Sequence, residues 1–207
     1  MNGPEVRLPV LLVVADSSAT GGRALLPLLQ QAVAGGARGV WVREKGAAPT
    51  ARLRLIAQLS DLLHSVGGVL VASPGPGSEL ADGEHWPSAS APGQGGDGPS
   101  RRAGRSCHSP AELARAAAEG FAWATLSPIY ASASKPGYGP PLGPSSLCGA
   151  PLPTWALGGV DEANAAVCTR AGAAGVAVMG AVLGAADPGG AVASLLASLA
   201  EAGELVP

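Results

Sequence analysis

Lysine is rare in this chain, and both lysines stand in segments that could bind phosphate. Lys45 and Lys135 accompany eleven arginines, so arginine serves as the general surface cation. Lys135 belongs to the segment SPIYASASKPGYGPPLG, residues 127–143, which also contains Ser132 and Ser134. Ammonium groups and hydroxyls donate hydrogen bonds to anionic oxygens. These residue types predict a site for a phosphorylated small molecule.

Lys45 is accompanied by a second cation, Arg43, in the short segment VREK. If this segment is extended, its side chains alternate with a period of two. Arg43 and Lys45 then share one face, while Glu44 points to the other. Two positive charges on one face favour an anionic ligand.

Glycines near expected helix starts add backbone donors. Gly158 and Gly159 precede a predicted helix, and Gly180 lies in a glycine-containing segment after the last predicted strand. Backbone N–H groups at a helix start can meet an anion at the positive end of the helix dipole. Cations, hydroxyls and glycines therefore converge on phosphate chemistry.

The composition excludes several kinds of partner. The formal net charge is −2, with 13 basic and 15 acidic residues mixed along the chain, so no electrostatic footprint for nucleic acid or an anionic membrane is visible. Three cysteines lie far apart without a CxxC pair, which argues against a disulfide framework or a zinc site. The first apolar run, residues 8–15, is too short to span a membrane and lacks signal-peptide features. We expect a soluble cytoplasmic protein.

These cations, hydroxyls and glycines need a fold that brings them together, and a repeated sequence pattern indicates which fold. An Ala-rich helical run, a small-residue stop and a short aliphatic strand recur at 28–44, 112–128 and 162–180. Apolar runs without alternation indicate strands buried on both faces. Eight predicted strands in 207 residues favour a single-domain (β/α)8 TIM barrel over 1–207, with a doubly wound open sheet as the alternative. Further strands are expected at 8–15, 69–72, 83–86, 104–107 and 153–157, and helices at 21–34, 50–65, 109–119, 161–171 and 188–202.

Residues 74–106 do not follow the repeated helix–strand pattern, because they are rich in Gly, Pro and Ser and lack a periodic spacing of apolar residues. The third and fourth βα units are therefore predicted to be shortened or irregular. Within this region, 88–103 is predicted to be a flexible loop and the least ordered segment, with a mobile lid over the active-site face as the alternative.

Catalytic loops of a barrel follow the strands at their carboxyl ends. The loops at 43–49, 127–143, 158–161 and 179–184 are therefore expected to meet at one end of the barrel.

Five motifs follow one another in a fixed order: WVREK at 41–45, SCHS at 106–109, the segment at 127–143, ALGGV at 156–160 and GAAGVAVMGAVL at 172–183. Together they resemble thiamine phosphate synthase and its thiazole tautomerase relatives, a superfamily built on a (β/α)8 barrel. The resemblance covers most of the chain and is weakest at 66–105.

The resemblance implies a reaction and a set of residue roles. The synthase joins hydroxymethylpyrimidine diphosphate to thiazole phosphate and releases pyrophosphate, with magnesium helping to neutralise the departing charge. Such catalysis rests on anion stabilisation and positioning. By this resemblance, Arg43 and Lys45 would grip the pyrimidine diphosphate, Ser106 would lie near the pyrophosphate, Lys135 would meet the leaving group, Ser132 and Ser134 would hold substrate oxygens, Gly158 and Gly159 would form the thiazole-phosphate loop, and Gly180 would contribute to substrate binding.

Departures from the family pattern concern the metal above all. Trp41 stands where the family has glutamine. Ala72 and Ser73, and then Ser88 to Ser90, stand where two carboxylate ligands for magnesium are expected. Magnesium is thus expected from the family, while its ligands are not found in the sequence.

Three functions stay open on the sequence alone: a divergent synthase, an isomerase similar to the thiazole tautomerases, and a non-catalytic phosphate-ligand binding protein on the same barrel. Pro128 stands where the tautomerases carry an acid–base histidine. For His85 and His108, a hydrogen-bonded structural role is favoured over catalysis. A homo-oligomer is also compatible with the sequence.

Overall fold

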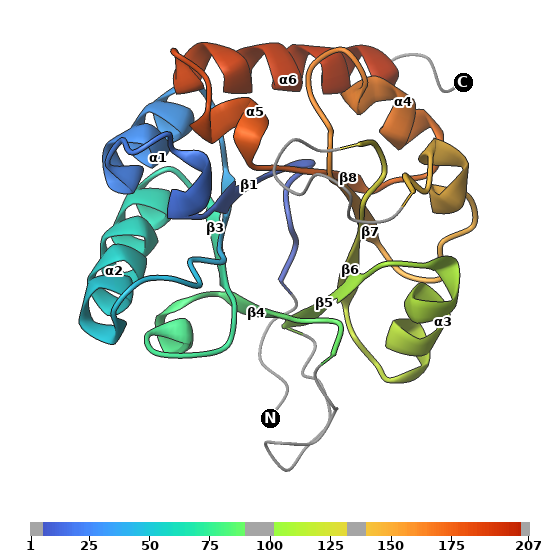
Figure 1. The fold of residues 1–207 in the computed structure, drawn as a ribbon, viewed down its shortest axis with the longest axis horizontal. Helices are drawn as coiled ribbons and strands as arrows, with labels where there is room; N and C mark the ends of the chain where they lie inside the picture. Colours follow the sequence, from blue (N-terminus) through green and yellow to red (C-terminus); the bar gives the residue numbers. More distant parts are fainter. Residues whose placement is uncertain (1–5, 90–101, 132–139, 204–207) are drawn as a thin grey trace.

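The structure is a computed structural model that describes residues 6–89, 102–131 and 140–203. Eight parallel strands form one closed barrel in sequence order, with β8 paired to β1 (Figure 1). This confirms the predicted (β/α)8 barrel and excludes the open sheet. The strands are β1 (Leu11–Ala15), β2 (Gly39–Val42), β3 (Val69–Ala72), β4 (Gly83–Trp86), β5 (Ala103–Cys107), β6 (Trp123–Leu126), β7 (Thr154–Leu157) and β8 (Gly175–Val178).

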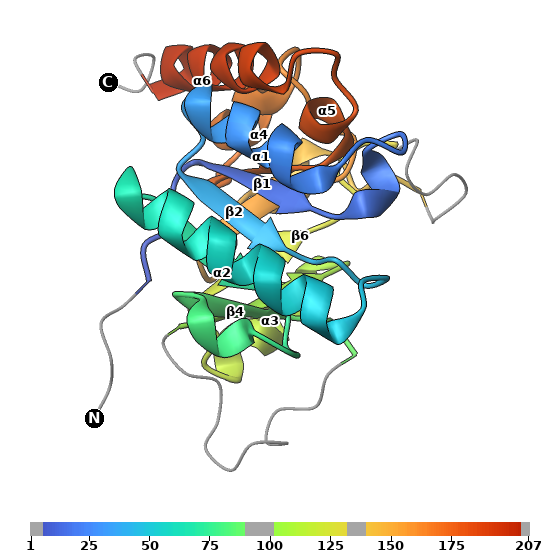
Figure 2. The same ribbon diagram turned by 90° about the vertical axis from the view of Figure 1, so that its left-hand side faces the viewer.

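Helices pack around the outside of the barrel, and Figure 2 shows α1, α2 and α6 from the side. Their apolar faces form one large core with the outward-facing residues of the strands. No described helix is both long and apolar enough to cross a membrane. The α-helices are α1 (Leu25–Ala34), α2 (Pro49–Ser65), α3 (Pro110–Ala118), α4 (Ala165–Arg170), α5 (Gly180–Leu183) and α6 (Pro188–Gly203).

The helix predicted at 21–34 begins later, at Leu25. Gly21 and Gly22 adopt positive φ angles of 62° and 85°. This left-handed backbone cannot continue into a right-handed helix. The short 3-10 helix η1 (Ser17–Ala19) and the two glycines therefore form a separate loop before α1.

The connections on either side of β4 differ from those of the other units. Between β3 and β4 the chain forms only the 3-10 helix η2 (Ser78–Leu80). The connection between β4 and β5 passes largely through residues 90–101, which lie outside the described residues. β5 begins at Ala103, so this strand takes the last residue of the predicted flexible loop at 88–103. For residues 90–101, flexibility stays a prediction.

The interior of the barrel contains three indole rings. Trp41, Trp123 and Trp155 belong to a second apolar cluster, separate from the core beneath the helices. Each buried indole N–H has an acceptor, as buried tryptophans generally require. These acceptors are Ser73 Oγ at 3.1 Å from Trp41, His85 Nδ1 at 3.2 Å from Trp123, and the carbonyl oxygen of Pro9 at 2.9 Å from Trp155.

Glycines on neighbouring strands make room for two of these rings. Gly104 of β5 pairs with Trp123 of β6, and a Cβ atom at Gly104 would lie 1.9 Å from the indole Nε1. Gly175 of β8 pairs with Trp155 of β7, and a Cβ atom there would lie 2.5 Å from Nε1. Because protein interiors are close-packed, the large ring and the missing side chain must occur together.

Gly104→Ala is expected to lower the free energy of unfolding by about 1–3 kcal/mol, because Trp123 cannot move aside without straining its surroundings. Urea-induced unfolding measures the change. Gly46→Ala is the control, since a Cβ atom there would meet nothing within 4 Å, and its effect should stay within about 0.5 kcal/mol. An unchanged unfolding midpoint in Gly104→Ala would contradict the close contact between these strands.

Candidate functional site

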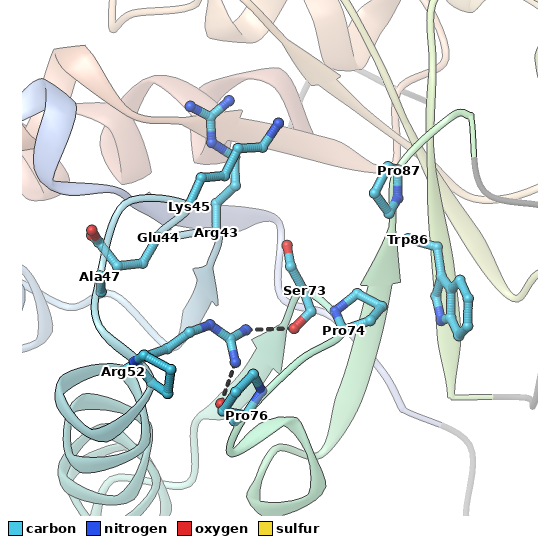
Figure 3. Close-up of a pocket in the computed structure, with 11 residues that line it drawn as sticks. Arg43, Glu44, Lys45, Ala47, Arg52, Ser73, Pro74, Pro76, Trp86 and Pro87 are labelled. Atoms are coloured by element: carbon cyan, nitrogen blue, oxygen red, sulfur yellow. Dashed lines mark hydrogen bonds between the residues drawn. The ribbon is translucent and has the colours of Figure 1, made fainter.

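A pocket of about 510 Å³ opens beside the loops that follow β2, β3 and β4 (Figure 3). Because all eight strands are parallel, these loops lie at the carboxyl end of the barrel, where this fold carries its active sites. The volume is typical of small-molecule sites. Residues that line it include Arg43, Lys45, Arg52, Ser73, Trp86 and Pro87.

Arg43 and Lys45 project to the same side of the loop after β2, while Glu44 points away (Figure 3). This is the arrangement that alternation in an extended segment predicts. Glu44 is buried, and its carboxylate oxygens accept hydrogen bonds from the backbone N–H and the hydroxyl of Ser17, each at 2.7 Å. This contact joins the loop after β2 to the loop after β1 and fixes the backbone that carries the two cations.

Asp16 follows β1 and holds Arg43 by an ion pair. Its Oδ2 accepts a hydrogen bond from Arg43 Nε at 2.8 Å, and its Oδ1 accepts from the backbone N–H and hydroxyl of Ser18. Burial alone would raise the pKa of Asp16, but the hydrogen bonds from Ser18 and Arg43 outweigh burial and place this pKa below its ordinary value. The carboxylate is therefore charged at neutral pH. Within the described residues, no group accepts from Nη1 or Nη2 of Arg43, which leaves both for an anion.

Arg52 shapes the wall of the pocket formed by the loop after β3. This buried arginine of α2 donates to the backbone carbonyl oxygens of Ser73 and Pro76, as the dashed lines in Figure 3 show. The Ser73 hydroxyl in turn accepts the indole N–H of Trp41 at 3.1 Å. Arg52 therefore positions the loop rather than offering its guanidinium to a ligand.

Ser106, near the end of β5, lies beside a buried histidine. The Nε2 atom of His85 lies 3.2 Å from both Ser106 Oγ and Thr125 Oγ1, and its Nδ1 accepts from Trp123. The Trp41 ring packs against the imidazole with 4.2 Å between ring centroids. Burial lowers the pKa of His85 to about 3, so the imidazole is neutral. His85 is thus hydrogen-bonded, as predicted, while the preference for a structural over a catalytic role stays a prediction.

His108 also makes structural hydrogen bonds, as predicted. Its Nδ1 lies 2.9 Å from the carbonyl oxygen of Ser127 and 3.2 Å from the Ser127 hydroxyl. Its backbone N–H donates to Glu112 at 2.9 Å. His108 therefore ties the loop after β5 to the loop after β6.

Gly158 and Gly159 follow β7 with positive φ angles of 93° and 67°. A Cβ atom on Gly159 would lie 2.4 Å from the carbonyl oxygen of Ala131, and the backbone N–H of Tyr130 donates to the Gly158 carbonyl at 2.9 Å. Only glycine permits both the backbone conformation and this approach. The two glycines therefore bring the loop after β7 against the loop after β6.

The helix predicted to begin directly after these glycines, at 161–171, starts only at Ala165. A hydrogen-bonded turn at Asp161 precedes it: Asn164 Oδ1 accepts from the backbone N–H of Asp161 at 3.1 Å, and the backbone N–H of Ala165 donates to the Asp161 carbonyl at 2.9 Å. The Asp161 carboxylate also accepts from the backbone N–H of Ala163 at 3.0 Å, a reciprocal pattern typical of a helix start. The helix therefore starts later than predicted, and the anion-binding role of the two glycines stays a prediction. Gly180 is exposed and opens α5, which has only four residues.

Ser132, Ser134 and Lys135 lie outside the described residues, and their binding roles stay predictions. The described parts of the same segment, 127–131 and 140–143, follow β6. They therefore emerge at the carboxyl end of the barrel, the end that carries Arg43 and Lys45.

Among the described residues at this end, the positions where the resemblance places the carboxylates of a magnesium site lack a carboxylate. Ala72, Ser73 and Ser88, which follow or end β3 and β4, carry none. Asp16 and Glu44 use both of their carboxylate oxygens to accept hydrogen bonds from neighbouring residues. Nowhere in the described ranges are three or more His, Cys, Asp or Glu side chains grouped to hold a metal ion. Magnesium needs oxygen ligands in near-octahedral geometry, which these bonds oppose.

Sequence reasoning does not single out Asp16 or Arg52 and says of Glu44 only that it points away. A polar residue directly after the first buried strand is the signal that could have found Asp16, because strand ends of a barrel line the site. No local signal reveals the partners of Glu44 and Arg52. Their contacts join residues 27 and 21 positions apart in the chain.

Comparisons with known proteins agree with this architecture. A profile of the family described as "Thiamine monophosphate synthase" matches residues 97–182. The chain is 36% identical to a relative from Geobacter sulfurreducens, over 91% of this chain and 93% of that protein. It is 33% identical to the thiamine-phosphate synthase of Roseiflexus castenholzii, over 90% of this chain and 86% of that protein. The thiamine phosphate pyrophosphorylase structure from Pyrococcus furiosus shares the fold, with a TM-score of 0.79 and 21% identity over 93% of this chain and 96% of that one.

Arg43→Met is expected to raise the pKa of Asp16, because burial then acts without the hydrogen bond and charge of the guanidinium. It should also lower the free energy of unfolding at neutral pH by about 1–3 kcal/mol, since a buried acceptor loses its partner. Carboxyl carbon NMR titration and urea unfolding measure the two effects. Lys45→Met is the control, because Lys45 is exposed; an equal shift of the Asp16 titration in both variants would contradict the ion pair.

The neutral state of His85 makes stability depend on pH. Its pKa is about 3 in the folded protein and about 6.5 in an unfolded chain. Between these values the unfolded state binds a proton that the folded state does not, so stability falls as the pH drops below about 6.5. When the pH is lowered from about 7.5 to about 5.5, His85 should therefore reduce the free energy of unfolding by about 1.4 kcal/mol.

Urea unfolding at both pH values, compared with His85→Gln, isolates this contribution. The variant should lose less stability on acidification than the unmodified protein by that amount. Equal pH dependence in the two proteins would show that His85 is not held neutral.

Proposed function

Because the chain belongs to the thiamine-phosphate synthase family, we propose that it is a thiamine-phosphate synthase of thiamine biosynthesis. The reaction couples hydroxymethylpyrimidine diphosphate with thiazole phosphate and yields thiamine phosphate and pyrophosphate. The observation that carries the proposal is the pocket at the carboxyl end of the barrel, bordered by Arg43 and Lys45, in a chain related to a synthase over 90% of its length.

The reaction breaks the bond between the pyrimidine methylene carbon and the diphosphate oxygen, and the thiazole nitrogen forms the new bond to that carbon. The protein must stabilise the leaving anion and hold the two rings in line. Arg43, oriented through Nε by Asp16, offers Nη1 and Nη2 as a fork for phosphate oxygens. Lys45 adds a mobile point charge on the same side.

The remaining roles are proposed from the family motifs. We assign Lys135 and Ser106 to the leaving pyrophosphate, Ser132 and Ser134 to substrate oxygens, Gly158 and Gly159 to the thiazole phosphate, and Gly180 to substrate binding.

A cytoplasmic location and a homo-oligomeric state also stay predictions.

We further propose that this protein binds magnesium weakly and couples its substrates slowly. The support is the donor set, in which Asp16 and Glu44 are engaged and Ser73 stands without a carboxylate. Fixed cations offset part of the diphosphate charge, but they do not bridge its oxygens as a metal does. The same observation favours the second candidate, a phosphate-ligand binding protein without turnover.

Ser73→Asp tests this proposal because Ser73 lines the pocket. The added carboxylate is expected to raise magnesium affinity and magnesium-dependent turnover by roughly tenfold. Ser73→Asn is the matched control, with similar size and no charge, and should change neither quantity. Release of pyrophosphate from both substrates, measured across magnesium concentrations, gives the turnover.

The unmodified protein separates the candidate functions. Slow coupling supports the synthase, and thiazole phosphate binding without coupling supports the binding protein. Coupling near ~10 per second with full dependence on magnesium would contradict the proposed weak metal binding. Lys135→Ala should lower turnover by roughly 10²-fold with little change in thiazole phosphate affinity.

A further inference from the structure

A chain of hydrogen bonds inside the barrel ends on Ser106, and Trp123 sets its direction. An indole N–H can only donate, so the Nδ1 atom of His85, 3.2 Å away, must accept. A neutral imidazole carries one proton, which therefore lies on Nε2. Nε2–H then donates to the two hydroxyl oxygens 3.2 Å away, those of Ser106 and Thr125.

The surroundings of His85 hold it in this tautomer. The side chain is 1% exposed, and the Trp41 ring packs against it. A charged imidazole would place an Nδ1–H against the N–H of Trp123, which is repulsive. Burial, which lowers the pKa of His85 to about 3, acts in the same direction.

The two hydroxyls that accept from His85 differ in their access to a ligand. Thr125 is completely buried, whereas Ser106 is partly exposed near the carboxyl end of β5. In the part of the chain that the structure describes, the Ser106 hydroxyl makes no hydrogen bond besides the one with His85. Because one lone pair of Ser106 Oγ faces Nε2–H, its own proton must point elsewhere.

We propose that His85 is a positioning residue that turns the Ser106 hydroxyl so that it donates its hydrogen bond to the phosphorylated substrate. This inference rests on the proposed function and adds a residue and a donor direction to it. No proton leaves the imidazole. Ser106 touches the anion, and His85 acts only through Ser106.

A double-mutant cycle tests the connection between the two residues. Ser106→Ala and His85→Leu are each expected to weaken binding of inorganic pyrophosphate by roughly tenfold, because each removes an oriented hydrogen bond to a charged group. The double variant should bind no more weakly than either single variant. Calorimetric titration with and without magnesium gives the affinities, and kcat/KM for coupling provides a second cycle.

Two further variants separate positioning from simple packing. His85→Gln places an amide N–H near the position of Nε2 and should retain affinity within about twofold, since the donor is kept. Thr125→Val is the matched control, because it removes the other acceptor of the same N–H without touching Ser106, and it should also stay within about twofold. Thermal unfolding of every variant distinguishes loss of the site from loss of the fold.

Nitrogen-15 NMR of the unmodified protein keeps the inference testable even if His85→Leu fails to fold. The expected result is a neutral His85 with its proton on Nε2. A proton on Nδ1, a charged imidazole, or independent losses in the double-mutant cycle would each overturn the inference.

Failure of the proposed function gives a different pattern. No turnover together with an intact cycle for pyrophosphate would contradict the synthase and retain the positioning role of His85. Normal turnover, together with independent effects of Ser106→Ala and His85→Leu in the double-mutant cycle, would support the synthase function and overturn this inference. No binding of pyrophosphate and no turnover in the unmodified protein would overturn both.

Discussion

Three indole rings occupy the interior of the barrel. Each ring needs space beside it and an acceptor for its N–H group, and these two needs determine which residues can be its neighbours. Trp123 fits its neighbouring strand because Gly104 has no side chain, and such complementarity leaves little freedom for either residue. Each ring also brings an N–H that must be paired once it is buried. Trp123 donates to His85 and Trp41 donates to Ser73. The packing of the barrel thus fixes hydrogen bonds both inside the barrel, at His85, and at the wall of the pocket, at Ser73.

Above this layer, the charges of the site are held by their neighbours. Asp16 binds Arg43 through Nε alone, so the outer edge of the guanidinium stays available. Glu44, between the two cations in sequence, is turned away and used to join two loops through Ser17. A cation that is oriented before the substrate arrives does not have to reorganise during the reaction. This preorganisation is the main source of electrostatic catalysis.

The pocket combines the cations Arg43 and Lys45 with Ser73, which carries no carboxylate. Ser73 stands at the rim of the pocket, and its hydroxyl already accepts from Trp41. With the weak magnesium binding that we propose, a leaving pyrophosphate would depend more on fixed N–H and O–H donors than on a bridging ion. Such donors act only at short range and in one direction. Under that proposal, the precision of contacts such as those of Asp16 and His85 matters more than in a site that relies on a metal.

The sequence by itself determined the strands, the helices and the grouping of Arg43 with Lys45, because these depend on local propensity and on alternation within one segment. It also showed that loops after strands would share one end, since parallel strands allow nothing else. It could not reveal that Asp16 pairs with Arg43, or that Trp123 and His85 together orient Ser106, since those partners lie far apart in the chain. The helix expected at 161–171 begins only at Ala165, after a hydrogen-bonded turn at Asp161. Only closure of the barrel decided these contacts, because it brings distant strands to hydrogen-bonding distance and excludes water from between them.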